Sequence, residues 1–282
     1  MFESHFKFIA PPFQLSPDPS FYFESSGHGR ALSYLKYGIY QREGFIVVTG
    51  EIGSGKTTLV RTLLNGLDTS EVVAAQVVST QLDSSELLHT ICVAFGVPVP
   101  GPSKAQMLGT LEAFFTALAA GGRRALLIID EAQNLGLKEV EELRMLSNFQ
   151  LGPGALLQSF LVGQPELRLM LRASAMEQLR QRVIASCHLG PLSADETRAY
   201  VEHRLRRVGW NAFPVIAGEA FAAIHSFSGG IPRRINVLCT RVLLACWLSG
   251  KKDISAHDVG EAAAELDAEL GSSGASQTAS PL

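Results

Sequence analysis

The residues best suited to chemistry lie in a glycine-rich stretch, VVTGEIGSGKTT, at positions 47–58. Gly50, Gly55, Lys56 and Thr57 match the spacing G-x-x-x-x-G-K-[ST], with a short apolar run before it and a helical pattern after it. Glycines let backbone N–H groups curl around a phosphate, and the start of the helix adds its positive dipole end. Lys56 is expected to reach the β and γ phosphates of a nucleoside triphosphate, and Thr57 to hold Mg2+. The residues expected to bind the nucleotide are Gly50, Glu51, Ile52, Gly53, Ser54, Gly55, Lys56, Thr57 and Thr58.

Two adjacent carboxylates follow another apolar run, ALLIIDEAQ, at residues 125–133. If this run is a buried strand, Asp130 and Glu131 lie at its carboxyl end, where they would face the phosphate loop. Hydrolysis needs a metal ligand and a base for the attacking water, so we expect Asp130 to bind Mg2+ and Glu131 to act as the base. An acidic pair alone is more often a solvated loop. Downstream of a phosphate loop it indicates triphosphate hydrolysis.

Arginines near the ends of predicted helices could complete such a site. The stretch EQLRQRVIA contains Arg180 and Arg182, and SGGIPRRIN contains Arg233 and Arg234. A guanidinium at the γ phosphate stabilises the charge that spreads during phosphoryl transfer, and a neighbouring subunit can supply it. Arginines at helix ends are commonly solvated surface residues, and spacing alone does not choose among these four.

The elements that must position these residues alternate between apolar strands and helical segments. Strands are predicted at 45–50, 72–79, 125–131, 155–163 and 183–190, with helical patterns between them. Five such strands predict an α/β domain with a parallel sheet covered by helices on both faces, and such sheets bind ligands at the carboxyl ends of their strands. Helical patterns without an intervening strand follow at 194–210, 217–228, 233–248 and 255–266. They predict a small all-helical domain.

These patterns divide the chain into four parts. Residues 1–29 are rich in proline and aromatic residues and are expected to be an extended segment held by Phe and Tyr side chains. An α/β domain is predicted at 30–191 and a helical lid domain at 192–270. Residues 271–282 are small and polar, so we expect a disordered tail.

Composition excludes several classes of protein. With 282 residues, 46% hydrophobic and 18% charged, the chain can bury a large core. Its net charge of -3 gives no overall basic field that would draw it to DNA or anionic lipid. The beginning lacks a signal-peptide pattern and no apolar run is long enough to span a bilayer, so we expect a cytoplasmic protein. The four cysteines lack metal-ligand spacing and are expected to be reduced, buried thiols.

Taken together, four separate motifs resemble those of AAA+ P-loop NTPases. They are GEIGSGKT at 50–57, DEAQ at 130–133, LRQR at 179–182 and GIPR at 230–233. The chain also resembles the ExeA/GspA-type ATPases of secretion systems and, within them, the ATPase associated with exosortase (PEP-CTERM) and exopolysaccharide loci. This likeness runs over residues 1–270 and includes the stretches PFQLSPDPSFYFESSGH, YGIYQREGFIVVTGEIGSGKTTL, LRMLSNFQ and GQPELR.

The resemblance implies roles for further residues. Gln164 matches the polar residue that senses the γ phosphate, a position more often held by Asn, Ser or Thr. Arg233 matches the lid arginine that contacts the nucleotide of its own subunit, and Arg180 or Arg182 matches the finger that reaches a neighbouring subunit. The resemblance thus implies ATP and Mg2+ as cofactors and a homo-oligomer that shares its ATP sites. Secretion-type relatives carry a membrane-spanning and a peptidoglycan-binding region after the ATPase, and initiator-type AAA+ proteins add a winged helix. Because this sequence closes in a polar tail, we expect neither here.

These features favour an ATPase that couples nucleotide state to assembly or remodelling of a cell-envelope export or polysaccharide system, with a protein as its partner. Two alternatives stay open. A nucleotide-dependent regulator or loader, including a transposition-type DNA regulator, would hydrolyse ATP only as a reset. A small-molecule P-loop kinase would explain the loop but not the acidic pair or GIPR. The stretch HRLRRVGW at 203–210 is the only feature that favours DNA, and a helix face with solvated arginines explains it better.

Overall fold

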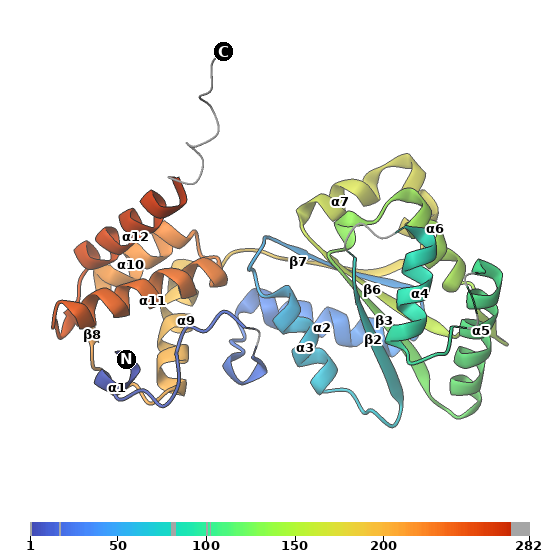
Figure 1. The fold of residues 1–282 in the computed structure, drawn as a ribbon, viewed down its shortest axis with the longest axis horizontal. Coiled ribbons are helices and arrows are strands. Elements are labelled where there is room, and N and C mark those ends of the chain that lie inside the picture. The colour runs from blue at the N-terminus through green and yellow to red at the C-terminus, as the bar shows by residue number, and fades with distance from the viewer. Residues whose placement is uncertain (1, 17, 80–82, 100, 102, 272–282) are drawn as a thin grey trace, which may run out of the picture. The chain divides into compact units, whose positions relative to one another are not determined.

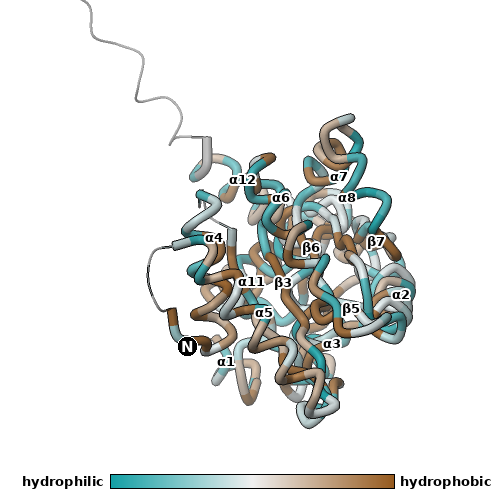
Figure 2. Tube along the Cα trace, turned by 90° about the vertical axis from the view of Figure 1, so that its right-hand side faces the viewer, coloured by the Kyte–Doolittle hydropathy of each residue, from teal (hydrophilic) through white to brown (hydrophobic). Residues whose placement is uncertain are grey.

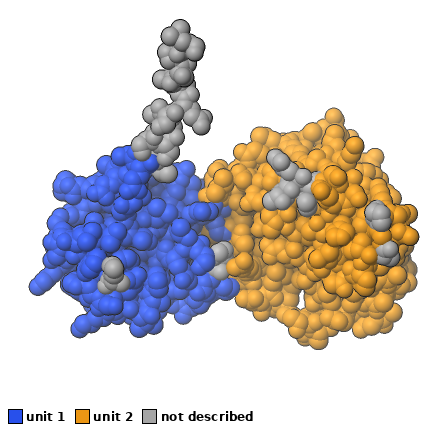
Figure 3. All heavy atoms as spheres, in the orientation of Figure 1, with its two compact units in different colours: residues 1–25, 53–55, 191–282 blue, residues 26–52, 56–190 orange. Residues whose placement is uncertain are grey.

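The structure, a computed structural model, describes residues 2–16, 18–79, 83–99, 101 and 103–271. It divides into two compact units (Figure 3). The α/β unit comprises residues 26–52 and 56–190, and the helical unit comprises 1–25, 53–55 and 191–282. The tip of the glycine-rich loop, Gly53–Gly55, belongs to the helical unit.

The α/β unit is built on the five-stranded parallel sheet that the sequence predicts. Its strand order is β2-β3-β6-β1-β7. The strands are β1 (Phe45–Gly50), β2 (Val72–Val78), β3 (Arg124–Asp130), β6 (Leu157–Gly163) and β7 (Val183–Leu189). Every residue of β1 and β6 is buried, as expected for central strands covered on both faces. All five carboxyl ends therefore lie along one edge of the sheet.

Helices cover both faces of the sheet, as Figure 1 shows. On one face lie α2 (Ser26–Gln41) and α3 (Lys56–Asn65); α2 approaches the sheet at Gly38, where an added Cβ would lie 2.2 Å from the Ile46 side chain. The other face packs against α4 (Ser84–Ala94), α5 (Lys104–Ala120), α6 (Leu137–Leu146) and α7 (Pro165–Arg172), which share a core with Phe45, Val47 and Leu127. Figure 2 shows the apolar residues along β3 and β6. This confirms the predicted α/β fold class.

Some connections differ from the sequence pattern. The helix α6 ends at Leu146, and a small antiparallel pair that the pattern does not predict, β4 (Gln150–Leu151) with β5 (Gly154–Ala155), follows it. Gly152 has φ +60° at the turn, a conformation that suits glycine and reverses the chain. Two 3-10 turns, η2 (Ala132–Asn134) and η3 (Ser174–Met176), and the short α8 (Glu177–Arg180) complete the unit.

The helical unit contains the four helices that the sequence predicts. They are α9 (Ala194–Arg207), α10 (Gly218–Ser228), α11 (Pro232–Leu248) and α12 (Ala256–Gly271). The pattern predicts no strand here, whereas two short parallel strands, β8 (Val215–Ile216) and β9 (Asp253–Ile254), pair with each other. Two-residue strands give no periodic signal, because their pairing joins segments far apart in the sequence.

The N-terminal segment belongs to this helical unit. It contains a one-turn helix, α1 (Phe2–His5), and a 3-10 turn, η1 (Pro19–Phe21), although the sequence predicts an extended segment. Phe6, Phe8 and Phe13 are buried in the helical core, so aromatic side chains do hold the segment. The tail predicted at 271–282 lies, from residue 272, outside the described residues.

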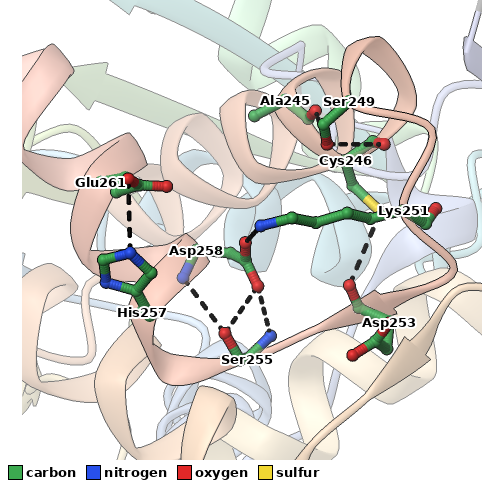
Figure 4. A network of polar contacts seen from close by, with 9 residues as sticks. All are labelled: Ala245, Cys246, Ser249, Lys251, Asp253, Ser255, His257, Asp258 and Glu261. Carbon is green, nitrogen blue, oxygen red and sulfur yellow. Dashed lines mark hydrogen bonds and ion pairs between the residues drawn. The ribbon is translucent and has the colours of Figure 1, made fainter.

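The start of α12 is fixed by a network of polar contacts (Figure 4). Ser255 donates from its backbone N and its Oγ to Asp258 Oδ2, at 2.8 and 2.6 Å, and Lys251 pairs with the other oxygen of Asp258. Although burial alone would raise the pKa of Asp258, these donors lower it to about 2. The carboxylate therefore stays ionised and stabilises the first turn of the helix.

Among the described residues, none of the helices is both long enough and apolar enough to cross a membrane.

Candidate nucleotide site

The glycine-rich loop joins the carboxyl end of β1 to the first residue of α3. Gly53 and Gly55 have φ angles of +82° and +98°, which side-chain-bearing residues rarely adopt. The strand ends at Gly50 and the helix begins at Lys56, so the strand–loop–helix arrangement expected from the sequence is present. Such a loop presents its backbone N–H groups at a helix N-terminus, which is a favourable site for a phosphate.

Lys56 is buried at the base of this loop. Its Nζ donates to the carbonyl oxygens of Gly50, at 2.8 Å, and Glu51, at 3.0 Å. Burial lowers the pKa of Lys56, while the nearby carboxylates of Glu131 and Asp130 oppose that shift. The amine is thus held near the loop by neutral acceptors, which a phosphate oxygen can replace.

Asp130 ends β3 and lies next to the start of α3. Its Oδ2 accepts from Thr57 Oγ1 at 3.5 Å and from Gln76 Nε2 at 3.4 Å, and its Oδ1 accepts from the backbone N of Glu131 at 3.0 Å. Burial raises the pKa of Asp130. A hydroxyl and a carboxylate oxygen side by side are the hard donors that Mg2+ prefers, so Thr57 and Asp130 fit that ion.

Glu131 follows in a strained backbone conformation. Its φ and ψ of 54° and 38° lie in the left-handed region, which non-glycine residues seldom occupy. Its Oε2 accepts from Gln133 Nε2 at 2.6 Å and from Gln164 Nε2 at 3.1 Å. Burial alone would raise the pKa of Glu131, but these two donors and the charge of Lys56 bring it below its usual value. The carboxylate is therefore ionised and fixed in orientation at neutral pH.

Gln133 is the residue of this group to which the sequence assigned no role. Besides holding Glu131, its Oε1 accepts from the backbone N of Gln164 at 2.9 Å, which ties the end of β3 to the end of β6. An added Cβ at Gly163 would lie 2.6 Å from that oxygen, so the glycine makes room for the contact. The DEAQ run already pointed to this role of Gln133, because a polar side chain two residues after the base can form a hydrogen bond with it.

Arg180 and Arg182 lie at the opposite edge of the sheet. Arg182 directly precedes β7, and its carbonyl oxygen accepts from the backbone N of Phe45, the first residue of β1, at 2.9 Å. Its Nη1 donates to Ser147 Oγ, the residue after α6, at 2.8 Å. Arg180 Nη1 contacts the carbonyl oxygens of Leu171 and Arg172 at the end of α7, both at 3.3 Å. Both arginines thus stabilise helix C-termini at this edge.

Arg233 belongs to the helical unit. It lies in the first turn of α11, directly after Pro232, and its side chain is exposed. The α/β unit therefore brings together Lys56, Thr57, Asp130, Glu131 and Gln164, while Arg180 and Arg182 lie at the opposite edge of the sheet. Within the helical unit, the backbone N of Arg233 donates to the carbonyl oxygen of Gly53, at the tip of the glycine-rich loop, at 3.1 Å.

The basic stretch at 203–210 is a face of solvated arginines only in part, because Arg206 and Arg207 are exposed and Arg204 is not. Arg204 is buried, and its guanidinium donates to the carbonyl oxygens of Pro12, at 2.6 Å, and Gln14, at 3.2 Å. Arg206 pairs with Glu202 at 2.6 Å. The sequence interpretation was wrong for Arg204, because this side chain holds the N-terminal segment within the helical unit.

Comparison with known proteins places this geometry in a family. Residues 39–171 match the model of the AAA domain family AAA_22. Over 267 residues the chain is 39% identical to general secretion pathway protein A of Aeromonas hydrophila, a match that covers 94% of this chain. The chain spans about half, 48%, of the length of that relative.

Solved structures share the fold. The Aeropyrum pernix ORC2 protein, in its ADPNP-ADP complexes, superposes with a TM-score of 0.68 at 18% identity, over 90% of this chain and 71% of that one. Cdc6p from Pyrobaculum aerophilum gives a TM-score of 0.68 at 17% identity, over 90% and 70%. The matched residues and the similarity to general secretion pathway protein A show that the chain contains an AAA domain and is related, over 94% of its own length, to that protein.

Proposed function

We propose that the chain binds ATP with Mg2+ at the carboxyl edge of its sheet and hydrolyses it. The observation that carries this proposal is the ionised Glu131 carboxylate, held by Gln133 and Gln164 beside the Thr57–Asp130 pair. A base with a fixed orientation can take the proton of an attacking water. The ADPNP-ADP complexes of the structurally similar ORC2 protein support an adenine nucleotide as the ligand.

The residues around the loop would share the work of binding. Thr57 and Asp130 would hold Mg2+, which would neutralise charge on the phosphate oxygens. Lys56 exchanges the carbonyl oxygens of Gly50 and Glu51 for anionic phosphate oxygens, which are stronger acceptors. The backbone of Gly50–Thr58 surrounds the phosphates.

Gln164 is proposed to report the γ phosphate. Its amide now donates to the base, Glu131, at 3.1 Å, and it directly precedes Pro165, the first residue of α7. A γ phosphate within reach of the same amide would compete with Glu131 for its N–H group. Gain or loss of that phosphate would thereby change the hydrogen bonding of Gln164 and the position of the start of α7.

The arginines would complete the site from elsewhere. We propose that Arg233 contacts the nucleotide bound by its own chain, and that Arg180 acts on the γ phosphate of a second copy. Arg180 suits this role better than Arg182, because its side chain is exposed and its contacts are longer, 3.3 Å against 2.8 Å. The chain would then work as a homo-oligomer in the cytoplasm, where ATP is supplied.

The partner is proposed from the relative. General secretion pathway protein A supports a role in a cell-envelope export system, including the exosortase and exopolysaccharide systems, where nucleotide state would drive assembly or remodelling of a protein partner. The burial of Arg204 removes one of the cations that favoured the DNA-regulator alternative.

Phosphate release from ATP by the purified protein tests the proposal directly. We expect turnover that requires Mg2+ and stops when EDTA is added, with the Thr57→Ala variant showing the same loss without EDTA. Equal phosphate release with and without Mg2+ would contradict the proposed metal site. No release above that of a Glu131→Gln variant would contradict hydrolysis itself.

A further inference from the structure

A threonine–histidine pair connects the end of β1 to the neighbouring strand β7, next to the glycine-rich loop. Thr49 precedes Gly50 at the end of β1, and His188 is its partner in the parallel register with β7. His188 Nδ1 lies 3.1 Å from Thr49 Oγ1. Thr49 is fully buried, whereas His188 as a whole residue is exposed. The pair therefore connects a buried hydroxyl near the end of β1 to a solvent-exposed residue at the carboxyl edge of the sheet.

The hydrogen bonds of this pair fit both charge states of the imidazole. Thr49 Oγ1 is also within 3.4 Å of the Cys187 carbonyl oxygen. With a neutral ring, the hydroxyl can donate to Nδ1. With a protonated ring, Nδ1–H donates to the hydroxyl, which then donates to Cys187 instead. Protonation thus costs the pair no hydrogen bond.

The charged groups that act on the ring belong to the loop and its neighbours. Although His188 is exposed as a whole residue, partial burial of its ring lowers its pKa; the cations Arg168 of α7 and Lys56 of α3 lower the pKa further, and Glu51 of the loop opposes them. Among the described residues, only Thr49 forms a hydrogen bond with this ring. The neutral form of the imidazole therefore predominates at pH 7, and the ring is electrostatically coupled to Lys56 and Glu51. A triphosphate bound between these residues would add several negative charges.

We propose that His188 is a further residue of the nucleotide site, which takes up a proton when the polyphosphate binds and holds the end of β1 through Thr49. This inference rests on the proposed nucleotide binding. Because a ligand that favours the protonated ring binds better when the ring is protonated, nucleotide affinity should rise as pH falls. Uptake of a full proton would change affinity by about tenfold per pH unit.

Binding of a fluorescent, non-hydrolysable ATP analogue between pH 8 and pH 6 tests the inference, with wild type compared to His188→Gln. Titration of the nucleotide's own phosphate is common to both proteins and cancels in the ratio of their affinities. We expect this ratio to rise at least about threefold in favour of wild type as pH falls, a fraction of the one-proton limit. A ratio that stays constant across this range would overturn the inference.

The helical unit offers a matched control. Thr197 Oγ1 lies 3.0 Å from His225 Nδ1, a pair with the same chemistry on α9 and α10. His225→Gln should keep the wild-type pH profile. The same loss of pH dependence in His225→Gln would assign the effect to general destabilisation and overturn the inference.

Proton NMR of the wild-type imidazole signals keeps the test independent of how well the variants fold. The chain has seven histidines, and the signal of His188 is the one missing from the His188→Gln or the His188→Asn spectrum. Its pKa should rise when ADP is added, and an unchanged pKa in the bound protein would overturn the inference. If wild type binds no nucleotide at any pH, the proposed function fails; if it binds with the pH profile of His188→Gln, only this inference fails.

Discussion

The two edges of the five-stranded sheet carry polar residues of different kinds. At the carboxyl edge, Lys56, Asp130 and Glu131 all have shifted pKa values, and Glu131 has a left-handed backbone. At the amino edge, Arg180 and Arg182 bind the C-terminal ends of helices. Backbone strain and perturbed pKa values are typical of sites that bind a ligand, whereas arginines that cap helices stabilise the fold.

The two edges of the sheet are also far apart. Six residues of β1 span the sheet between them, which is roughly 17 Å at about 3.3 Å per residue. Neither arginine can therefore reach a phosphate bound at the carboxyl edge of the same chain. One chain therefore carries a base, a metal site and Lys56 at the carboxyl edge but cannot bring the guanidinium of Arg180 to them. A second copy can provide it.

Removal of the loop lysine should produce the largest effect. In Lys56→Ala, a buried charge that would bind two phosphates is lost, so nucleotide affinity should fall at least about a hundredfold. Titration with a fluorescent ATP analogue measures this. Unchanged affinity would break the comparison, because the carboxyl edge would then not be the phosphate site.

Loss of the base should affect turnover but not binding. Glu131→Gln keeps the shape of the side chain and removes its basicity, so we expect hydrolysis to fall about 10²- to 10⁴-fold with affinity nearly unchanged. Steady-state phosphate release and a binding titration on the same sample give the two values. A variant that hydrolyses ATP at the wild-type rate would exclude Glu131 as the base.

At the amino edge, Arg180→Ala should leave nucleotide affinity within about twofold of wild type and lower hydrolysis about a hundredfold, if the guanidinium acts on a neighbour's site. Arg182→Ala is the matched control at the same edge. We expect it to act mainly on stability, because Arg182 is tied to Ser147. Full activity in Arg180→Ala with a large loss in Arg182→Ala would assign the finger to Arg182.

Substitution of Gln133 should shift the acid limb of the pH profile of ATP hydrolysis. Glu131 works as a base when ionised, so hydrolysis is lost as pH falls through its pKa, which Gln133 and Gln164 help to keep low. Gln133→Ala removes one of these donors, raises that pKa and moves the acid limb upward. We also expect about tenfold slower turnover at neutral pH, since the carboxylate is less well oriented. An acid limb at the wild-type pH would contradict this role.

The smallest effect is expected at the partner of Arg182. Ser147→Ala removes the acceptor of its guanidinium and the donor to the Arg144 carbonyl oxygen, so it should lower the free energy of unfolding by about 2 kcal/mol, at about 1 kcal/mol for each hydrogen bond. Chemical denaturation followed by circular dichroism measures this change. Nucleotide affinity should not change, and a marked loss of affinity would show that the two edges are coupled.

Much of the fold could be predicted from local sequence patterns. Apolar runs and helical periodicity identified the five strands and the four main helices of the helical unit, because burial repeats along each element. The glycine, lysine and threonine spacing identified the loop, since the motif is contiguous and its backbone needs φ angles open to glycine.

What the sequence did not predict depends on neighbours in space. Gln133 meets Gln164 because β3 and β6 are adjacent strands, and no local pattern gives strand order. Arg204 is buried because it meets the carbonyl oxygens of Pro12 and Gln14, about 190 positions away. In both cases, a polar side chain forms hydrogen bonds with a part of the chain that is distant in sequence.

A mixing experiment tests the central claim, that the two edges meet at one ATP site between copies of the chain. Glu131→Gln lacks the base but keeps Arg180, and Arg180→Ala has the opposite defect. In a mixed oligomer, the base of the second variant can face the arginine of the first. We expect the mixture to hydrolyse ATP several times faster than either variant alone at equal total concentration. A rate no higher than the average of the two separate rates would contradict the claim.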